Sequence, residues 1–527
     1  MSAYAATGTL GRLALRRDRA MIAAWVAGLT AVVLATGSSF GSLYDTAQKR
    51  ADLAASMNGN ASLRAFYGPM FGWDGTGALT AWRFTVLGAA LTGLMAAFVV
   101  VRHTRDDEES GRQELVSAGA VGRRAPLTAA LGTAIGAGFA VGLCVALGSA
   151  ANGGSVAGAA VFGLDLAAGA AVFAGVAAVA AQVAETGRGA RGIAGAVLAA
   201  AYLLRAAGDA ATDDASSPLV WVSPLGWIEN TRPYAGDRWW VLLLPFAFAA
   251  VCAAAAYALA ARRDVGAGLV AGRPGPPAAA PSLAGPFALA WRLHRGALAA
   301  WAGGFAVAGI VYGAVAGSVA DLVKDNQGVV DVIERMGGQA GITDAFLASA
   351  MALMGILAAV YAVQCVLRMR GEETSGRAEP VLAGAVGRLR WAGSHLVFAA
   401  AGPVLLLAVG GLATGLAHGA QIGGLVGAAV AQTPAVWAVA AAAAAVFGLL
   451  PRAMAAVWVL VALCVLLGMV GDALQLPQPV MDLSPFTHLP KLPGGDVELL
   501  PYALLTAVAG LLGAAAFAGT RRRDLGG

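Results

Sequence analysis

Long apolar runs that hold almost no charged residues recur along the whole chain and limit what it can fold into. Residues 84–101 and 127–150, for example, are mainly Ala, Leu, Val and Gly. About 20 apolar residues cross the hydrocarbon core as a helix, because only a helix or a closed barrel satisfies its own backbone there. Barrel strands would read as short alternating segments. Charged residues make up only 12% of the 527 positions, about half the share of a soluble domain. The predicted fold class is therefore an all-α, polytopic integral membrane protein.

The runs predict about 12 transmembrane helices. They lie near residues 21–40, 84–101, 127–150, 156–183, 193–204, 240–261, 298–319, 345–367, 396–416, 436–450, 454–470 and 500–518. Arginines gather in alternate loops, as in residues 102–124, and this bias predicts cytoplasmic N and C termini and an even number of spans. The net charge of +5 then reflects topology and an anionic lipid surface, and we expect no nucleic-acid partner.

One loop sequence occurs twice. Residues 105–123 read RDDEESGRQELVSAGAVGR, and residues 370–388 read RGEETSGRAEPVLAGAVGR, with 13 of 19 positions identical at a constant offset of 265. Basic segments before the first and seventh spans, and Ser-Pro loops at residues 221–227 and 482–488, repeat more weakly. The chain is therefore expected to be two parallel six-helix pseudo-repeats. Residues 1–265 form the first half, 266–286 a Pro/Gly/Ala-rich cytoplasmic linker and 287–527 the second half.

Residue patterns for catalysis are missing from the sequence. No span carries His, Glu or Cys at metal-ligand spacing, and none of the three lysines lies in a Gly-x4-Gly-Lys-Ser/Thr phosphate loop. The four cysteines fall inside apolar runs and are expected to be small core side chains. We therefore expect a transporter subunit rather than an enzyme, with no cofactor of its own. If ATP drives it, the ATP and Mg belong to a separate ATPase chain.

The repeated loop is the main candidate site. Its two copies are nearly identical beside spans that have diverged, and a pair of matching sockets for a symmetric partner would explain this. Ser110 with Gln113 predicts a capping box that starts a short helix. The second copy has Ala378 and Pro380 instead, so its helix is expected to start later or to be kinked. The candidate residues are Glu108, Glu109, Ser110, Gly111, Arg112 and Glu114 in the first copy and Glu372, Glu373, Ser375, Gly376, Arg377 and Glu379 in the second.

These loops resemble those of permeases of ATP-binding-cassette exporters. The fused twelve-span form is similar to the polyketide-antibiotic (tetronasin-type) exporter permeases of actinobacteria, over essentially the whole chain. The resemblance implies that the two loops are coupling helices that grip a homodimer of a separate nucleotide-binding ATPase. It also implies interfacial elbow helices at residues 11–19 and 289–295, and short extracellular helices in the Ser-Pro loops. The implied function is export of a hydrophobic or amphipathic, drug-like compound across the bacterial plasma membrane by alternating access.

Asp165 is the remaining candidate, for the substrate pathway. It is the only carboxylate well inside a predicted span, and ionisable groups in a membrane are functional candidates. It also carries the alternative function, a proton-coupled secondary carrier of the major-facilitator type with Asp165 in the proton or substrate path. The outer loops at residues 44–81 and 321–344 are expected either to cap the outer mouth or to be ordinary packing.

Overall fold

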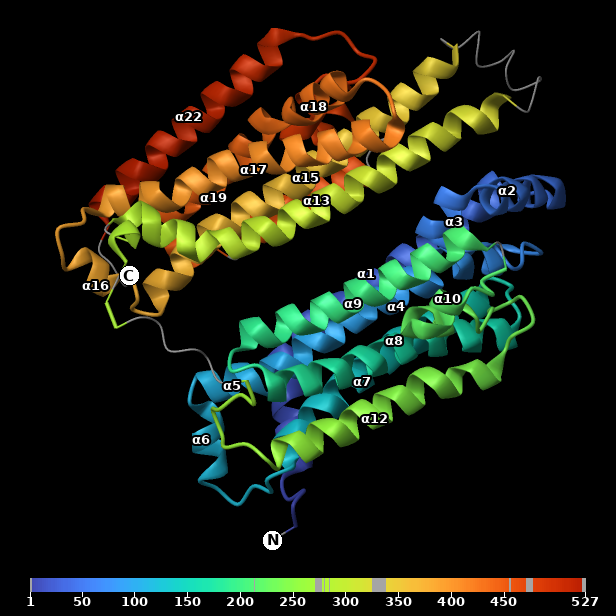
Figure 1. Ribbon diagram of the computed structural model, residues 1–527, viewed down its shortest axis with the longest axis horizontal. Coiled ribbons are helices and arrows are strands. Elements are labelled where there is room, and N and C mark those ends of the chain that lie inside the picture. The colour runs from blue at the N-terminus through green and yellow to red at the C-terminus, as the bar shows by residue number, and fades with distance from the viewer. Residues whose placement is uncertain are drawn as a thin grey trace. The chain divides into compact units, whose positions relative to one another are not determined.

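The computed structural model describes residues 2–212, 214–270, 277–278, 280–283, 285–324, 338–454, 456–470 and 477–523. The chain divides into two compact units, Met1–Gly275 and Pro276–Gly527. Every regular element in the described ranges is an α-helix or a short 3-10 helix (Figure 1). This confirms the all-α class. The predicted boundaries at 265 and 286 stay a prediction, and linker residues 271–276, 279 and 284 lie outside the described residues.

Eleven helical stretches within the described ranges are long and apolar enough to cross a membrane, which confirms a polytopic membrane protein. In the first unit they are α1 (Thr7–Leu43), α4 (Thr76–Arg102), α7 (Ala125–Ala151), α8 (Val156–Val183), α9 (Gly187–Ala211) and α12 (Leu243–Ala260). In the second unit they are α13 (Pro286–Lys324), α15 (Gly338–Thr374), α17 (Arg388–His418), α18 (Ile422–Val430) continued by α19 (Thr433–Leu449), and α22 (Leu499–Arg522). The span expected near 454–470 is α20 (Ala456–Val470), whose 15 residues fall short of the usual crossing length.

Helix α8 forms the centre of the first unit, where α4, α7, α9 and α12 pack around it (Figure 1). Small residues allow this close packing. A Cβ atom on Gly142 of α7 would lie 2.2 Å from the backbone oxygen of Gly163 in α8. A Cβ atom on Gly169 of α8 would lie 2.3 Å from the backbone oxygen of Ala89 in α4. Backbone therefore packs directly on backbone, and almost all of α8 is buried.

The second unit uses the same kind of contact between different helices. A Cβ atom on Gly309 of α13 would lie 2.4 Å from the backbone oxygen of Gly410 in α17. Gly448 of α19 meets the backbone of α22 at a similar distance. Helices α13 and α17 pack along most of their length. The high glycine and alanine content thus serves helix packing in both units.

Two segments expected to be separate elements are parts of longer helices. Residues 11–19 belong to α1 and residues 289–295 to α13, and each of these helices runs without a break into its span. Both basic segments are therefore helical, as expected, and each continues into the span that follows it; Gly296, directly after the second segment, does not interrupt α13.

The loops between spans are largely helical. Residues 44–81 contain α2 (Ala47–Gly59) and α3 (Ala61–Tyr67). The first Ser-Pro loop forms α10 (Pro218–Val222) and α11 (Pro224–Glu229), and the second forms α21 (Gln478–Met481) and the 3-10 helix η4 (Pro485–His488). The predicted short helices are present. Of the outer loop at 321–344, residues 325–337 lie outside the described residues.

Candidate functional site

Both copies of the repeated loop make the same turn. The first copy forms α5 (Arg105–Glu109) and α6 (Arg112–Ser117), and the second begins in the last residues of α15 and then forms α16 (Glu379–Leu382). Gly111 and Gly376 both have φ of +72°, a left-handed conformation that glycine adopts without a Cβ clash. The shared Ser-Gly pair therefore encodes a turn with one fixed backbone geometry.

The predicted capping box is absent from this turn. Gly111, not Ser110, is the N-cap of α6, and no side chain caps the helix. The Ser110 hydroxyl donates instead to the backbone oxygen of Asp107 at 3.3 Å. In the second copy α16 starts at Glu379, the counterpart of Glu114, two positions later in the repeat than α6. This later start agrees with the expectation drawn from Ala378 and Pro380.

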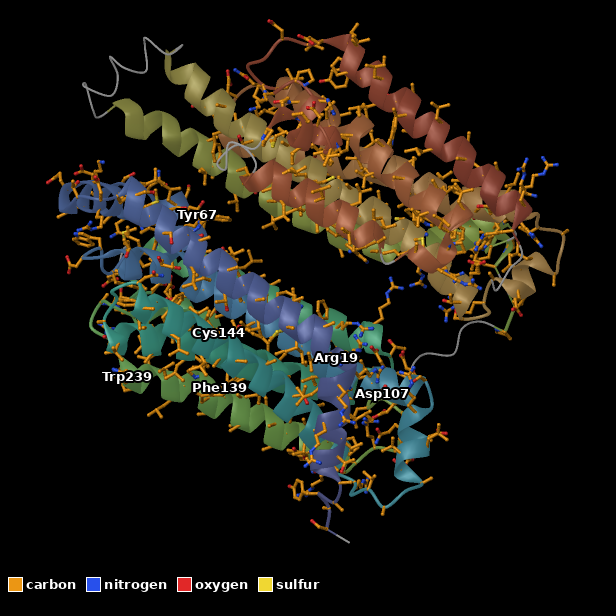
Figure 2. All side chains as sticks on the ribbon, turned by 180° about the vertical axis from the view of Figure 1, so that it is seen from behind. Arg19, Tyr67, Asp107, Phe139, Cys144 and Trp239 are labelled. Carbon is orange, nitrogen blue, oxygen red and sulfur yellow. The ribbon has the colours of Figure 1, made fainter. Side chains whose placement is uncertain are left out.

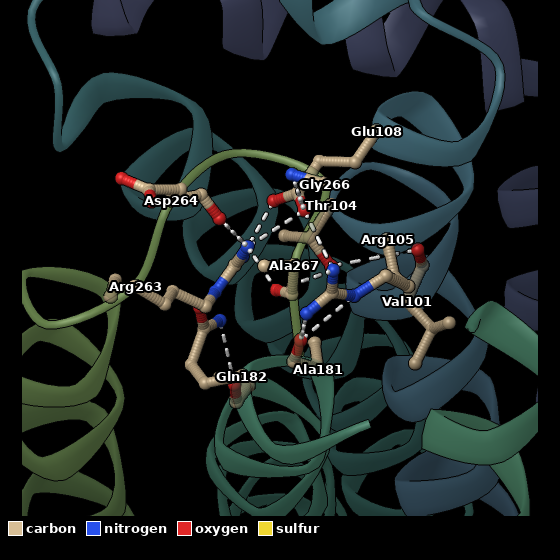
Figure 3. Close-up of polar contacts among 12 residues, drawn as sticks. Val101, Thr104, Arg105, Glu108, Ala181, Gln182, Arg263, Asp264, Gly266 and Ala267 are labelled. Carbon is tan, nitrogen blue, oxygen red and sulfur yellow. Dashed lines mark hydrogen bonds and ion pairs between the residues drawn. The ribbon is translucent and has the colours of Figure 1, made fainter. Parts of the chain in front are cut away.

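Glu108 is the centre of a buried ion cluster (Figure 3). Arg105 Nη1 lies 2.9 Å from Glu108 Oε2, and Arg263 Nη2 lies 2.6 Å from Glu108 Oε1. The Arg105 side chain is 0% exposed, and the side chains of Glu108 and Arg263 are 9% and 8% exposed. Arg263 follows α12, the last span of the unit, so Glu108 joins the loop after the second span to the end of the sixth. We call Arg105, Glu108 and Arg263 the first ion cluster.

The first ion cluster also holds the C-terminal end of α8. Arg105 Nε donates to the backbone oxygen of Ala181 at 3.0 Å, and Arg263 Nε donates to Gln182 Oε1 at 2.7 Å. The last carbonyls of a helix lack partners within the helix, so guanidinium donors are well placed there. Helix α5, the C-terminal end of α8 and the segment that follows α12 are thus joined around the Glu108 carboxylate (Figure 3).

The second copy forms the two corresponding ion pairs, although its last arginine contacts the glutamate through a single nitrogen. Glu373 Oε2 lies 3.0 Å from Arg370 Nη1 and 2.8 Å from Arg523 Nη2. Arg370 and Glu373 are the repeat counterparts of Arg105 and Glu108, and Arg523 follows α22 as Arg263 follows α12. The Arg523 guanidinium also lies over the Phe447 ring, 4.3 Å from its centre. We call Arg370, Glu373 and Arg523 the second ion cluster.

The last arginine of the repeat makes a further contact with the end of the same span. Arg123 Nη2 donates to the backbone oxygen of Ala261 at 3.3 Å. Its counterpart Arg388 donates through Nη1 to the backbone oxygen of Arg523 at 2.6 Å. Much of the identity between the copies therefore lies in contacts inside each unit.

The candidate residues divide into an inward and an outward group. Glu372 and Glu373 are buried, and Glu108 is nearly so. Exposed residues of the loops are Glu109, Ser110, Arg112 and Glu114 in the first copy and Ser375, Arg377 and Glu379 in the second, while Gly111 and Gly376 are half-buried. Leu115 between the charged residues is 78% exposed. We call this outward group the loop face.

Ion pairs support the loop face from below. Arg112 Nη1 lies 3.4 Å from Asp107 Oδ1, and the counterpart pair, Arg377 Nε and Glu372 Oε2, lies at 2.9 Å. Arg17 of α1 joins Asp107 at 2.8 Å. Figure 2 shows Asp107 and Arg19 near the same end of the first unit, away from Tyr67 and Trp239. The loop face therefore rests on charged groups with defined partners.

Sequence reasoning missed Arg263 and Arg523, although a signal was present. Residues 262–266 read RRDVG and residues 522–526 read RRDLG, each at the C-terminal end of the last span of its half. The offset of this pair is 260 rather than 265, so a search at one fixed offset does not find it. Residues 524–527 lie outside the described residues.

Asp165 lies far from the repeated loop. It is fully buried in α8, and its Oδ2 atom accepts a hydrogen bond from the Thr231 hydroxyl at 2.8 Å. Sixteen residues of helix separate Asp165 from Ala181, a rise of about 24 Å. The structure therefore does not bring Asp165 together with the other candidate residues.

A second buried charged group was also missed. Helix α9 extends beyond the predicted span at 193–204 and includes Arg205 and Asp209, so Asp165 is not the only carboxylate inside a long apolar helix. Arg205 Nη1 lies 3.0 Å from Asp209 Oδ2 and 3.5 Å from Glu229 Oε1, and all three side chains are at least nine-tenths buried. Burial raises the pKa of Glu229 well above its usual range. The Arg and Asp four residues apart were the only signal for this group.

One apolar cavity lies in the second unit, among α17, α19 and α22. Its volume is about 370 Å³, and it is lined by Leu396, Trp437, Ala440, Gly510 and Phe517 among others. All four cysteines are free. No group of three or more potential metal ligands occurs within the described part of the chain.

Known proteins match this chain along nearly its whole length. The family model described as "Multidrug efflux system permease Rv1217c, C-terminal domain" matches residues 8–260 and 283–521. The multidrug efflux system permease protein Rv1217c of Mycobacterium tuberculosis (strain ATCC 25618 / H37Rv) is 44% identical over 533 residues, which cover 98% of this chain and 95% of that protein. The two stretches matched by the family model contain both copies of the repeated loop. The chain therefore belongs to the family of the multidrug efflux system permease Rv1217c.

Proposed function

We propose that this chain is the permease subunit of an ATP-driven exporter that moves hydrophobic or amphipathic, drug-like compounds out of a bacterial cell. The family relative is a multidrug efflux permease by name, which supports an efflux role. The observation that carries the ATP-driven part is the duplicated loop face. Two copies of one charged turn, each exposed and each held on buried ion clusters, suit a partner that itself has twofold symmetry.

The partner in this proposal is a homodimer of a separate nucleotide-binding ATPase. Shifting a transporter from mostly inward-open to mostly outward-open takes about 5.5 kcal/mol of differential binding. One exposed ion pair supplies about 0–1 kcal/mol, so a single contact is not enough. Several contacts, from the charged residues of both copies and from the exposed Leu115 of the first, supply energy on the required scale.

The cargo follows from the spans. Their walls are mainly Ala, Val, Leu and Gly, and the cavity of about 370 Å³ in the second unit has the size of a small-molecule site. Such surfaces bind apolar molecules with little selectivity, which suits a hydrophobic or antibiotic-like substrate of the tetronasin type. The mechanism is alternating access in the plasma membrane, with ATP and Mg bound on the partner chain.

The experiment tests the loop face and leaves the buried clusters intact. The chain is reconstituted with the ATPase encoded beside it, and ATP-dependent transport of a hydrophobic dye is measured together with co-purification of the ATPase. The test variant combines Arg112→Glu and Glu114→Lys with Arg377→Glu and Glu379→Lys. The control combines Lys49→Glu with Glu498→Lys, two exposed reversals outside the loops. We expect the test variant to insert normally but to lose ATPase binding, and the control to retain it.

The alternative function is a proton-coupled secondary carrier, and Asp165 is the observation that favours it. The residue is fully buried, and its Oδ1 atom has no hydrogen-bond partner among the described residues. If the wild-type chain binds no ATPase, transports the dye in response to a pH gradient and loses transport with Asp165→Asn, the secondary carrier replaces our proposal. ATP-dependent transport that survives Asp165→Asn would rule the alternative out.

A further inference from the structure

We infer that Arg263 and Arg523 are positioning residues that transmit movement of each repeated loop to the last span of the same unit. This inference rests on the proposed function, because it says how a loop that contacts an ATPase displaces the transmembrane helices. The two ion clusters are the contacts through which the movement passes from the loop to the last span. Each connects a loop that carries part of the loop face to the end of a helix that crosses the membrane.

The contact is repeated although the chain between its partners has changed. The loops are offset by 265 residues and the Arg-Arg-Asp segments by 260, so the halves differ in length between loop and arginine. In both units the second arginine of the segment nevertheless binds the same glutamate of the loop, at 2.6 Å in the first unit and 2.8 Å in the second. A contact kept through such changes, beside spans that have diverged, points to a shared task.

Both ion clusters are buried, which limits the movement of their side chains. The Glu373 side chain is 2% exposed and that of Arg523 is 13% exposed, and the first cluster is buried to a similar degree. Water competes poorly for such pairs, and a bidentate guanidinium–carboxylate contact also fixes the orientation of its partners. Arg263 makes this contact with two nitrogens, both to Glu108. Arg523 contacts Glu373 through Nη2 alone and is also held by the Phe447 ring. A displacement of either loop therefore reaches the helix end through a buried contact.

A second contact joins each loop to the end of the same last span. Arg123 and Arg388 donate to backbone oxygens at the ends of α12 and α22. Each loop therefore contacts the end of the last span twice, through the glutamate near the start of the loop and through the arginine at the end of the loop. Helix α12 has 18 residues, and at 1.5 Å per residue it carries a movement across about 27 Å. The last span is the element that each loop is built to move.

The sequence offers a matched control for the test. Arg262 and Arg522 are the direct neighbours of Arg263 and Arg523, and both are exposed. Reversing their charge changes the net charge of the protein by the same amount at nearly the same place. The comparison therefore separates loss of the ion clusters from a general electrostatic effect on membrane insertion or ATPase docking.

The experiment measures the amount of hydrophobic dye transported per ATP hydrolysed in reconstituted complexes with the ATPase. Arg263→Glu with Arg523→Glu should keep ATPase binding and hydrolysis but reduce dye transported per ATP by about tenfold, within the usual range of coupling between sites. Arg262→Glu with Arg522→Glu should leave the ratio unchanged. Arg263→Lys with Arg523→Lys should keep most of the ratio, because lysine leaves a cation beside each glutamate and Arg105 and Arg370 keep their own partner.

Other outcomes overturn the inference. If the double variant transports as much dye per ATP as the wild type, the clusters do not transmit movement. If Arg263→Lys with Arg523→Lys gives a folded protein that has lost as much coupling as the charge-reversal variant, a cation at these positions does not carry the coupling and the inference also fails. Failure of the proposed function looks different, because the wild-type chain would then bind no ATPase at all.

Discussion

Replacing Arg205 with methionine should strongly destabilise the first unit, although the residue lies far along α9 from the repeated loop. The Arg205 side chain is 0% exposed and contacts two carboxylates, Asp209 at 3.0 Å and Glu229 at 3.5 Å. Its Nη2 atom also donates to the backbone oxygen of Ala65 at 2.9 Å. Methionine fills a similar volume but leaves both carboxylates buried without their cation.

The expected loss follows from these contacts. Removing one partner of a buried ion pair costs about 3–5 kcal/mol. We add no further energy for the lost backbone hydrogen bond, because it belongs to the same buried group. We therefore expect a loss of about 4 kcal/mol, a large part of the roughly 5–15 kcal/mol that keeps a protein folded. A unit of this size shifts its melting temperature by about 2 °C or more per kcal/mol. The melting temperature should fall by about 8 °C.

The assay compares three proteins in detergent by tryptophan fluorescence during heating. They are the wild type, Arg205→Met, and a triple variant that also carries Asp209→Leu and Glu229→Met. The triple variant should recover most of the loss, because replacing a whole buried ionic group by apolar residues removes the desolvation penalty. The single substitution should therefore be worse than the triple.

The same variants should respond to pH in a defined direction. Burial raises the pKa of Glu229 above its ordinary value of 4.5, so the folded state prefers the neutral carboxyl group. Stability from such a group is present below pH 4.5 and is lost as the pH rises through the raised pKa. Without Arg205 the deficit should be smallest at acid pH, where the carboxyl group is neutral, and should grow as the pH rises through the raised pKa. An Arg205→Met protein as stable as the wild type, or a triple variant as unstable as the single one, would refute the reasoning.

Three further predictions concern the helix packing, the turns and one helix cap. Gly142→Leu should lower the melting temperature, because its Cβ would lie 2.2 Å from a backbone oxygen of α8 and overpacking costs about 1–3 kcal/mol. Gly132→Leu on the same helix should be tolerated, because a Cβ there meets no atom within 4 Å. Equal effects of the two substitutions on the melting temperature would contradict the packing. Gly111→Ala with Gly376→Ala should cost about 1–2 kcal/mol per site because φ is +72° at both; an unchanged melting temperature would mean that the turns relax. Ser223→Ala should cost about 1 kcal/mol, since the hydroxyl donates to a backbone carbonyl of α9 at 2.6 Å and caps α11, and a melting curve identical to that of the wild type would show these bonds to be replaceable.

Eleven of the twelve expected spans were predictable from the length of their apolar runs, whereas the run at 454–470 forms α20, which is shorter than the usual crossing length. The end of the fifth span was not predictable, since Arg205 and Asp209 break the apolar run while the fold pairs them with Glu229, twenty residues beyond Asp209. Their cost in a membrane depends on a partner that no local pattern reveals. Charged residues near a span end are therefore ambiguous until the packing of the neighbouring loop is known.

The repeated loop was predictable as a special feature, but not the direction in which its side chains point. Glu108 and Glu373 were expected to contact a separate ATPase, because their partners within the chain, Arg263 and Arg523, lie some 150 residues away in the sequence. The capping-box pattern at Ser110 was present, yet the left-handed Gly111 took the N-cap position. Identity between repeats shows that a segment is constrained, while the partner it contacts follows only from the fold.

The central position of α8 has a consequence for how the protein is made. The helix is the fourth long span to leave the ribosome, but α9 and α12, which cover two of its sides, are synthesised after it. The hydrogen-bond partner of Asp165 is also synthesised later, because Thr231 lies 66 residues further along the chain. The backbone-to-backbone faces of α8 and its carboxyl group must therefore stay in the membrane, or at the insertion machinery, without their final neighbours. Nascent chains arrested before residue 239 should be prominent substrates for membrane quality control, and chains that include α12 should escape it.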